Sequence, residues 1–276
     1  MHKSKQIVVI SGVVVLMAVL LAQPIKGLVN KDTGATPEAA AEAALSFEQV
    51  SQAAKQGLNP SLISEITTLE SQLKGMEGER RLAQLQMIAQ KWDDVNRPAP
   101  MAYAYQELAE ATGEFDYWLQ AGDAYRQAYT NLSDTTLAQI FTNRAINAYE
   151  QALALDGGNL DAKTGLGSAY VSGSPNPMAG ITLLQEVVKA DPKHIQANKA
   201  LGLFSMQSRQ FDRAIDRFKT VVELAPDAES YFYLATSYEN IGLNREAIEA
   251  FEKSKQLAAD PTLTQFIDRK IEELNK

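Results

Sequence analysis

One glycine-rich stretch has residue types that could hold a phosphate: residues 165–180, with the sequence GLGSAYVSGSPNPMAG. A dinucleotide-binding loop needs a β-strand before it and a helix after it, so that backbone amides converge on the diphosphate. The preceding residues, GGNLDAKT, are instead typical of a turn and a helix start. We therefore expect no nucleotide here. We assign these glycines to helix packing and to a turn over residues 173–177, one residue longer than its later counterparts.

Other candidates for chemistry are few. The two histidines are His2, in a basic flank, and His194, in a turn where we expect it to be exposed and not metal-bound. Acidic pairs such as Asp93 and Asp94 are adjacent, and adjacent residues of a helix do not face each other. No Gly-x-Ser-x-Gly elbow, His-Glu-x-x-His pair or Gly-Lys-Ser/Thr phosphate loop occurs. We predict no catalytic, cofactor or metal site, and therefore no enzyme.

Composition narrows the classes of partner. The chain has 276 residues with 45% hydrophobic content, which is enough for a sizeable core. Its 34 acidic and 26 basic residues give a net charge of -8, so the basic surface that nucleic acids require is missing. Without cysteine there is no disulfide and no thiolate site. A protein partner is the remaining expectation.

The N-terminal residues 1–29 are typical of a membrane anchor or a signal peptide. Lys3 and Lys5 precede the run IVVISGVVVLMAVLLA at residues 7–22, whose length lies between a signal-peptide core and a full span. Because Leu20 fits a cleavage site badly, we predict a retained spanning helix. Lysines before the run place the N-terminus in the cytoplasm and the rest of the chain outside the inner membrane. A cleaved signal, leaving a soluble periplasmic protein, is the alternative.

The second half of the chain contains an internal repeat. Apolar and small residues recur 33 positions apart, for example Leu201 and Leu234, or Phe218 and Phe251. The full set of pairs is Leu201 and Leu234, Phe211 and Asn244, Ala214 and Ala247, Ile215 and Ile248, and Phe218 and Phe251. An earlier copy matches at Leu166, Gly167, Tyr170, Gly180, Ile181, Leu184, Val187 and Pro192. A period of this length indicates a solenoid.

Each copy is predicted to be a helical hairpin. Apolar residues recur at three- and four-residue steps, which is typical of two amphipathic helices. Small residues stand at the same place in each second helix, where a larger side chain would block its partner: Gly180, Ala214 and Ala247. Prolines mark the second-helix ends: Pro192, Pro226 and Pro261. Such a hairpin buries its apolar stripe only against a neighbour, so the hairpins must stack.

These recurring positions resemble the tetratricopeptide repeat, with three copies over residues 160–261. Residues 114–159 resemble a divergent copy, through Trp118, Ala121, Gly122 and Tyr125 in a first helix and Ala145, Tyr149 and Ala152 in a second. Tyr125 and Ala145 lie further apart than the pattern allows. Either both helices are longer, or ATGEFDYW closes one hairpin and residues 135–155 form a single long helix. The resemblance implies an all-α, right-handed solenoid.

Additional helices are expected on both sides of the repeats. Residues 30–59 read as a linker and an alanine-rich helix, capped by Thr36 and ended by Gly57. Residues 60–113 read as a hairpin region, in which residues 97–100 break the chain. A coiled-coil seam, with homo-oligomerisation through residues 38–95, is the alternative; its apolar residues would be Leu62, Ile66, Leu69 and Leu73. Residues 262–276, after Asp260 as cap, read as a capping helix.

The resemblance implies that a partner peptide or helix binds the concave face, which the first helices line. The facing positions are Gln196, Lys199, Leu203, Met206, Gln207, Phe232, Tyr233, Thr236 and Asn240. Packing between adjacent helices is the alternative role for Phe232 and Leu203. Lys199 alone matches the family's two-carboxylate clamp. The expected function is a non-enzymatic scaffold of the bacterial envelope; a periplasmic adaptor resembling a cell-division coordinator is the alternative, and an enzyme of unknown chemistry a remote third.

Overall fold

The computed structural model describes residues 45–130 and 132–276. In these residues every regular element is an α-helix, and there are thirteen. In chain order they are α3 (Phe47–Ala54), α4 (Pro60–Leu73), α5 (Gly78–Asp94), α6 (Pro98–Thr112), α7 (Phe115–Tyr129), α8 (Thr135–Leu155), α9 (Leu160–Gly173), α10 (Pro177–Ala190), α11 (Ile195–Gln207), α12 (Phe211–Leu224), α13 (Ala228–Asn240), α14 (Asn244–Leu257) and α15 (Pro261–Leu274). The predicted all-α fold is confirmed for this part of the chain.

The expected membrane-spanning helix falls in residues 1–29, outside the described residues. The helices between residues 45 and 276 include none that is both long and apolar enough to cross a bilayer.

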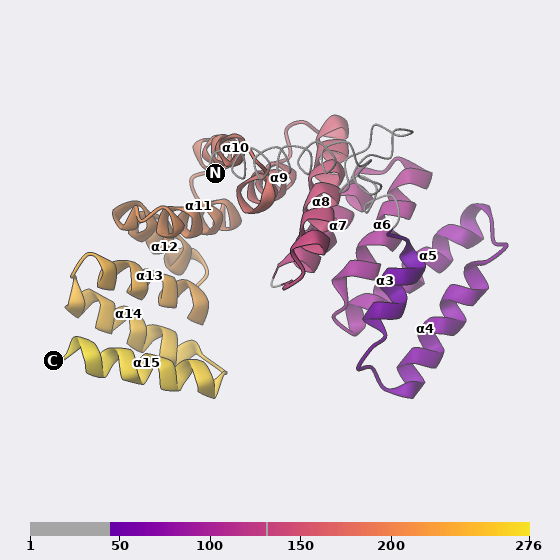
Figure 1. Ribbon diagram of the computed structural model, residues 1–276. Coiled ribbons are helices and arrows are strands. Elements are labelled where there is room, and N and C mark those ends of the chain that lie inside the picture. The colour runs from indigo at the N-terminus through magenta and orange to yellow at the C-terminus, as the bar shows by residue number, and fades with distance from the viewer. Residues whose placement is uncertain (1–44, 131) are drawn as a thin grey trace, which may run out of the picture. The chain divides into compact units, whose positions relative to one another are not determined.

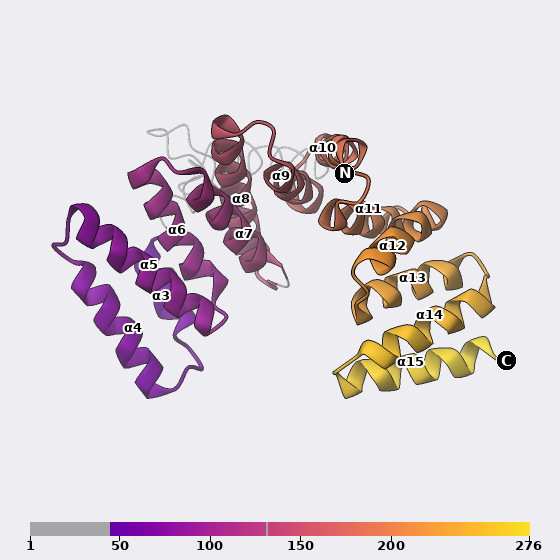
Figure 2. The same cartoon turned by 180° about the vertical axis from the view of Figure 1, so that it is seen from behind.

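From α4 to α15, consecutive helices pack side by side along the chain, whereas α3 packs on α6 (Figures 1 and 2). The predicted hairpins are present: α9 packs on α10, α11 on α12, and α13 on α14. Contacts of α10 with α11 and of α12 with α13 join successive hairpins, and α15 covers α14. Asp260 caps α15 and Pro261 begins it, as predicted. Each hairpin thus buries its apolar stripe against the next, as repeat stacking requires.

The glycines of residues 165–180 sit at close helix crossings. A Cβ added to Gly180 would lie 2.3 Å from the backbone oxygen of Gly167, and one added to Gly165 would lie 2.3 Å from the ring of Tyr149. Both distances are far inside van der Waals contact, so no larger residue fits without a shift. Packing therefore accounts for these glycines, and the residues before them form a capped helix start at Asn159.

The predicted long turn over residues 173–177 is wrong. Helix α9 continues to Gly173 and α10 begins at Pro177, so the link has three residues, 174–176, like the links 208–210 and 241–243. The extra residue lies in α9, which has 14 residues where α11 and α13 have 13. Pro177 takes the first helical position, where its missing amide hydrogen costs nothing, and Asn176 caps the helix.

The divergent hairpin over residues 114–159 has features of both predicted arrangements, the longer helices and the single long helix over residues 135–155. Gly113, with φ of 70°, ends α6, and residues 135–155 form one helix of 21 residues. Even so, α7 pairs with α8 as a repeat hairpin does: a Cβ on Gly122 would lie 2.7 Å from Tyr149, just as one on Gly202 would lie 2.9 Å from Phe218. The glycine-to-aromatic crossing is kept while both helices are longer.

The helices nearest the N-terminus differ in two ways from expectation. The alanine-rich helix does not run continuously to Gly57, because Ser46 is extended and closes a capping box with Gln49, so that α3 begins at Phe47. The prolines at 98 and 100 do not break the chain before a helix; they occupy the first turn of α6. Helices α4 and α5 form a hairpin, in which α5 covers the stripe containing Ile66 and Leu73.

Candidate functional site

The first helices of the repeats, α9, α11 and α13, are neighbours, and we call the surface they share the first-helix face. Polar side-chain contacts connect successive helices across it. His194 Nε2 lies 3.2 Å from Asp161 Oδ1, and Lys199 Nζ lies 2.5 Å from Glu229 Oε2. Further along, the ammonium of Lys270 on α15 pairs with a carboxylate of α13. Charges on this face are therefore largely balanced within the chain.

On α11, the predicted site residues divide into an exposed and a half-buried group. Gln196 and Gln207 are exposed, and Leu203 keeps 37% of its surface accessible. Lys199 and Met206 are half-buried. The exposed group gives α11 one apolar side chain between two amides, which is suited to a partner segment with an apolar residue and free backbone polar groups.

On α13, the predicted residues are mostly engaged within the chain. The ring of Phe232 lies 5.7 Å from that of Phe251 and 5.8 Å from that of Phe266, so it joins the packing of α14 and α15. The Thr236 hydroxyl donates to the Phe232 carbonyl oxygen, and the Asn240 amide donates to the Thr236 carbonyl oxygen. Packing, the alternative role for Phe232, is present.

Tyr233 is linked to the same carboxylate as Lys199. Its hydroxyl donates to Glu229 Oε1 at 3.0 Å, while its ring packs 5.4 Å from that of Phe218. Burial, together with the neighbouring Glu229 carboxylate, raises the pKa of Tyr233 to about 12, so the phenol stays protonated and keeps donating. Lys199, Glu229 and Tyr233 thus form one hydrogen-bonded group across α11 and α13.

Sequence reasoning did not identify Glu229 as a site residue, although the spacing of the repeats indicates where it lies. Glu229 stands 33 positions after Gln196, and Lys199 stands 33 positions before Phe232. Equivalent positions of neighbouring first helices lie side by side in a stacked solenoid. Aligning the copies would therefore place Glu229 beside Gln196, which is about one helical turn from Lys199 and within reach of the long lysine side chain.

His194 is not the exposed turn residue that the sequence suggested. Its side chain is only 11% exposed, and it caps α11 by accepting a hydrogen bond at Nδ1 from the Ala197 amide. With Nδ1 as the acceptor, the hydrogen-bond network assigns the ring proton to Nε2, which then donates to Asp161. The histidine therefore has a structural role at the contact between α9 and α11.

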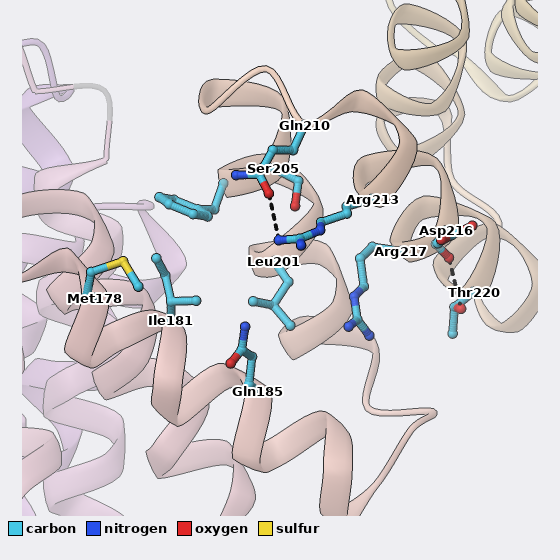
Figure 3. Close-up of a pocket in the computed structure, with 11 residues that line it drawn as sticks. Met178, Ile181, Gln185, Leu201, Ser205, Gln210, Arg213, Asp216, Arg217 and Thr220 are labelled. Carbon is cyan, nitrogen blue, oxygen red and sulfur yellow. Dashed lines mark hydrogen bonds between the residues drawn. The ribbon is translucent and has the colours of Figure 1, made fainter. Parts of the chain in front are cut away.

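A pocket of about 590 Å³ lies on the side of α11 that faces away from the first-helix face (Figure 3). Because helix positions advance by about 100° per residue, Leu201, Phe204 and Ser205 point away from the first-helix face. The pocket lies between α10 and α12, which both pack on α11. Its lining residues are Met178, Ile181 and Gln185 of α10, Leu201, Phe204 and Ser205 of α11, Gln210, and Arg213, Asp216, Arg217 and Thr220 of α12.

Two arginines and four apolar side chains set the character of this pocket. Arg213 donates to Gln210 Oε1 at 2.7 Å, and Arg217 donates to Asn198 Oδ1 at 3.1 Å. Within the described residues neither guanidinium forms an ion pair, and Asp216 lies beyond ion-pair distance of both. A guanidinium with only neutral partners keeps its capacity for a carboxylate. Sequence reasoning missed this pocket.

The described residues contain no group of three or more histidine or acidic side chains placed to hold a metal ion. The geometry places two guanidiniums beside a partly apolar pocket on one side of α11, and a charge-balanced face with an exposed leucine on the other.

Comparisons with known proteins agree with this architecture. Residues 200–262, from within α11 to the start of α15, match the tetratricopeptide repeat family. The match spans the two hairpins α11–α12 and α13–α14, and repeats of that family stack into solenoids with extended surfaces. No curated protein matches the sequence.

Solved structures with the same stacking include that of TTC0263, a thermophilic TPR protein from Thermus thermophilus. It shares 14% identity with this chain, with a TM-score of 0.54 over 69% of this chain and 98% of its own, which shows a common fold. The crystal structure of MamA protein shares 22% identity over 63% of this chain and 90% of its own, with a TM-score of 0.47.

Proposed function

We propose that the protein is a non-enzymatic scaffold that holds a segment of another envelope protein on its first-helix face. The observation that carries the proposal is the continuity of this face. The hydrogen bond of His194 to Asp161 connects α11 to α9, and the Lys199–Glu229 ion pair connects α11 to α13. Leu203 stays 37% exposed between the amides of Gln196 and Gln207. A rigid, pre-formed surface with an apolar anchor binds a peptide without paying for its own ordering.

The partner contacts are centred on α11. Leu203 supplies the apolar contact, Met206 an adaptable edge, and Gln196 and Gln207 hydrogen bonds to the partner's backbone. Lys199 is already paired with Glu229, so a carboxylate of the partner would have to displace that pair. Phe232 and Tyr233 support the face from beneath, because their rings pack on α14, α15 and α12.

We propose further that residues 1–29 anchor this scaffold in the inner membrane, with the repeats on the outer side. The support is sequence-based: two lysines precede the apolar run of residues 7–22. The intact mass of the mature protein decides between an anchor and a cleaved signal, because loss of residues 1–22 would leave the periplasmic adaptor form.

Site-specific photo-crosslinking in living cells tests the binding face. A photoreactive amino acid at Gln196, Leu203 or Gln207 is expected to give one shared adduct. The same amino acid at Glu252 or Gln256 of α14, which are exposed on a second helix, should not give that adduct. An adduct of equal yield from both sets of positions, or none from the first set, would refute the first-helix face as the binding site.

A further inference from the structure

The pocket between α10 and α12 exists because one repeat lacks a side chain that the next repeat has. Ser205 of α11 corresponds to Tyr238 of α13, 33 positions later. Tyr238 is half-buried and packs against the core there, with Lys219 of α12 placed 5.8 Å from its ring centre. A serine at the equivalent place leaves the space beside α11 open, and this space is the pocket of about 590 Å³.

The charged side chains of the pocket are also specific to this repeat. Arg213 corresponds to Glu246 in the next hairpin, and Arg217 corresponds to Ala250. Two arginines four positions apart lie on the same face of α12. Figure 3 shows both extending from α12 toward the space lined by α10 and α11. The positive pair is therefore found where the cavity is, and not at the next repeat contact.

The apolar side chains of the pocket indicate that its ligand also has an apolar group. Met178 is 63% exposed at the rim, while Leu201 is 5% and Ile181 6% exposed deeper in. Methionine is adaptable and suits the entrance of a peptide-binding pocket. A ligand that uses all of these groups has one large apolar side chain for the cavity and one or two carboxylates for the guanidiniums.

We propose that this pocket, which we call the arginine pocket, is a second docking site that binds an acidic protein segment with an aromatic or aliphatic anchor. The apolar anchor enters between α10 and α12 against Leu201 and Phe204. The flanking carboxylates accept hydrogen bonds from Arg213 and Arg217, replacing the neutral oxygens of Gln210 and Asn198. The site goes beyond the proposed function, because it lies on the opposite side of α11 from the first-helix face.

Peptide binding to the purified full-length protein tests the arginine pocket. The probe is a fluorescein-labelled peptide in which aspartates alternate with leucine and phenylalanine; its control has asparagine in place of every aspartate. We expect fluorescence anisotropy to show about tenfold or tighter binding of the acidic probe, because charged hydrogen bonds are stronger than neutral ones. This preference should shrink at high salt.

Two sets of variants locate the binding. Arg213→Gln with Arg217→Gln should abolish the preference for the acidic probe. Arg245→Gln with Lys253→Gln, which removes the same charge from exposed positions of α14, should keep it. Ser205→Tyr copies the next repeat and fills the cavity, so it should weaken binding of both probes about tenfold. Its thermal midpoint checks that the larger side chain fits without strain.

Three results would overturn the proposal: no binding of the acidic probe, equal binding of both probes, or full affinity in the Arg213 and Arg217 double variant. Photo-crosslinking from Leu203 reports on the other side of α11. The first-helix face and the arginine pocket can therefore fail independently.

Discussion

Two regions of this chain use the same type of helix crossing to different extents. From α9 to α14, each hairpin repeats one plan: helices of 13 or 14 residues, three-residue links, and a small residue at the crossing. From α3 to α8, helix length varies from 8 to 21 residues, and only α7 and α8 keep the glycine-to-aromatic crossing. A repeat can thus vary in length while its crossing point stays fixed.

In the first region, α3 to α8, individual polar contacts join the helices where α9 to α14 have a repeated pattern of residues. Lys55, the C-cap residue of α3, is buried and pairs with Glu70 of α4 at 2.6 Å, and Glu70 also accepts a hydrogen bond from Ser51 of α3. The carbonyl oxygen of Leu45 accepts a hydrogen bond from the Tyr103 hydroxyl. These contacts join residues that share no repeat position, whereas in α9 to α14 the buried residues recur at equivalent positions of successive hairpins, as Phe218 and Phe251 do. The first region depends on individual partners, and the second on a pattern.

If the pattern carries stability in the second region, equivalent residues must be energetically equivalent. Phe218 and Phe251 occupy the same repeat position, and both are fully buried. We expect Phe218→Ala and Phe251→Ala each to lower the free energy of unfolding by about 3 to 5 kcal/mol, from lost burial and a cavity. Urea unfolding followed by circular dichroism measures both.

Phe266→Ala is the control for this pair, since Phe266 is 39% exposed and should cost clearly less. A difference between the Phe218 and Phe251 variants as large as either effect would show that the repeats are not interchangeable.

The first region should respond most to the loss of one buried charge partner. Lys55→Ala leaves the Glu70 carboxylate without its cation in a site where the lysine side chain is 7% exposed. We expect a loss of about 3 kcal/mol in the free energy of unfolding. Replacing both partners, with Lys55→Met and Glu70→Leu, should recover most of it, because a buried pair is often no better than an apolar one.

Lys91→Ala is the matched control, because Lys91 pairs with Glu65 of the same helix α4 at the same 2.6 Å. Glu65 is exposed, so water can replace the lysine, and the change should be much smaller. Equal effects of Lys55→Ala and Lys91→Ala would contradict the assignment of stability to the buried pair.

The regular region could be predicted from the sequence, and its period is the reason. Each hairpin, its small crossing residue and the cap at Asp260 follow from local spacing, which requires no knowledge of distant contacts. The long turn was the exception: both a turn and one more residue of helix fit residues 173–177. Gly173 lies close to Thr142 of another hairpin, and local spacing does not reveal such a contact.

The site was harder to predict, because its features are differences between copies. Lys199 and Leu203 follow from the repeat register, but pairing with Glu229 depends on the neighbouring helix. The arginine pocket depends on a missing side chain at Ser205, and spacing rules describe the residues that are present. In α3 to α8, the contact of Lys55 with Glu70 joins two helices whose separation no local pattern specifies.

Close helix crossings within the regular region provide the next test. Gly180→Ala would place a Cβ 2.3 Å from the backbone oxygen of Gly167, and backbone cannot rotate away as a side chain can. We expect a loss of about 1 to 3 kcal/mol in unfolding free energy. Gly157→Ala is the control: its nearest neighbour would be 3.4 Å away, so no loss is expected. An unchanged stability for Gly180→Ala would mean that α9 and α10 separate freely.

The smallest expected effect concerns helix caps at equivalent positions. Asp227 caps α13 where Asn159 caps α9, but only Asp227 titrates. Burial opposes the charged form of Asp227, but hydrogen bonds from the hydroxyl and amide of Ser230 outweigh burial, so its pKa is lowered from the ordinary 3.8. A carboxyl with a lowered folded pKa stabilises the fold above its unfolded pKa and loses that contribution as the pH falls through the folded pKa.

Asp227→Asn keeps a cap but removes this pH dependence of stability. We expect the wild type to be more stable by no more than about 1 kcal/mol at neutral pH, with the difference shrinking below pH 3.8. Thermal midpoints of both proteins across this range measure it, and a difference that stays constant into acid would show that the charge on Asp227 contributes nothing to the cap.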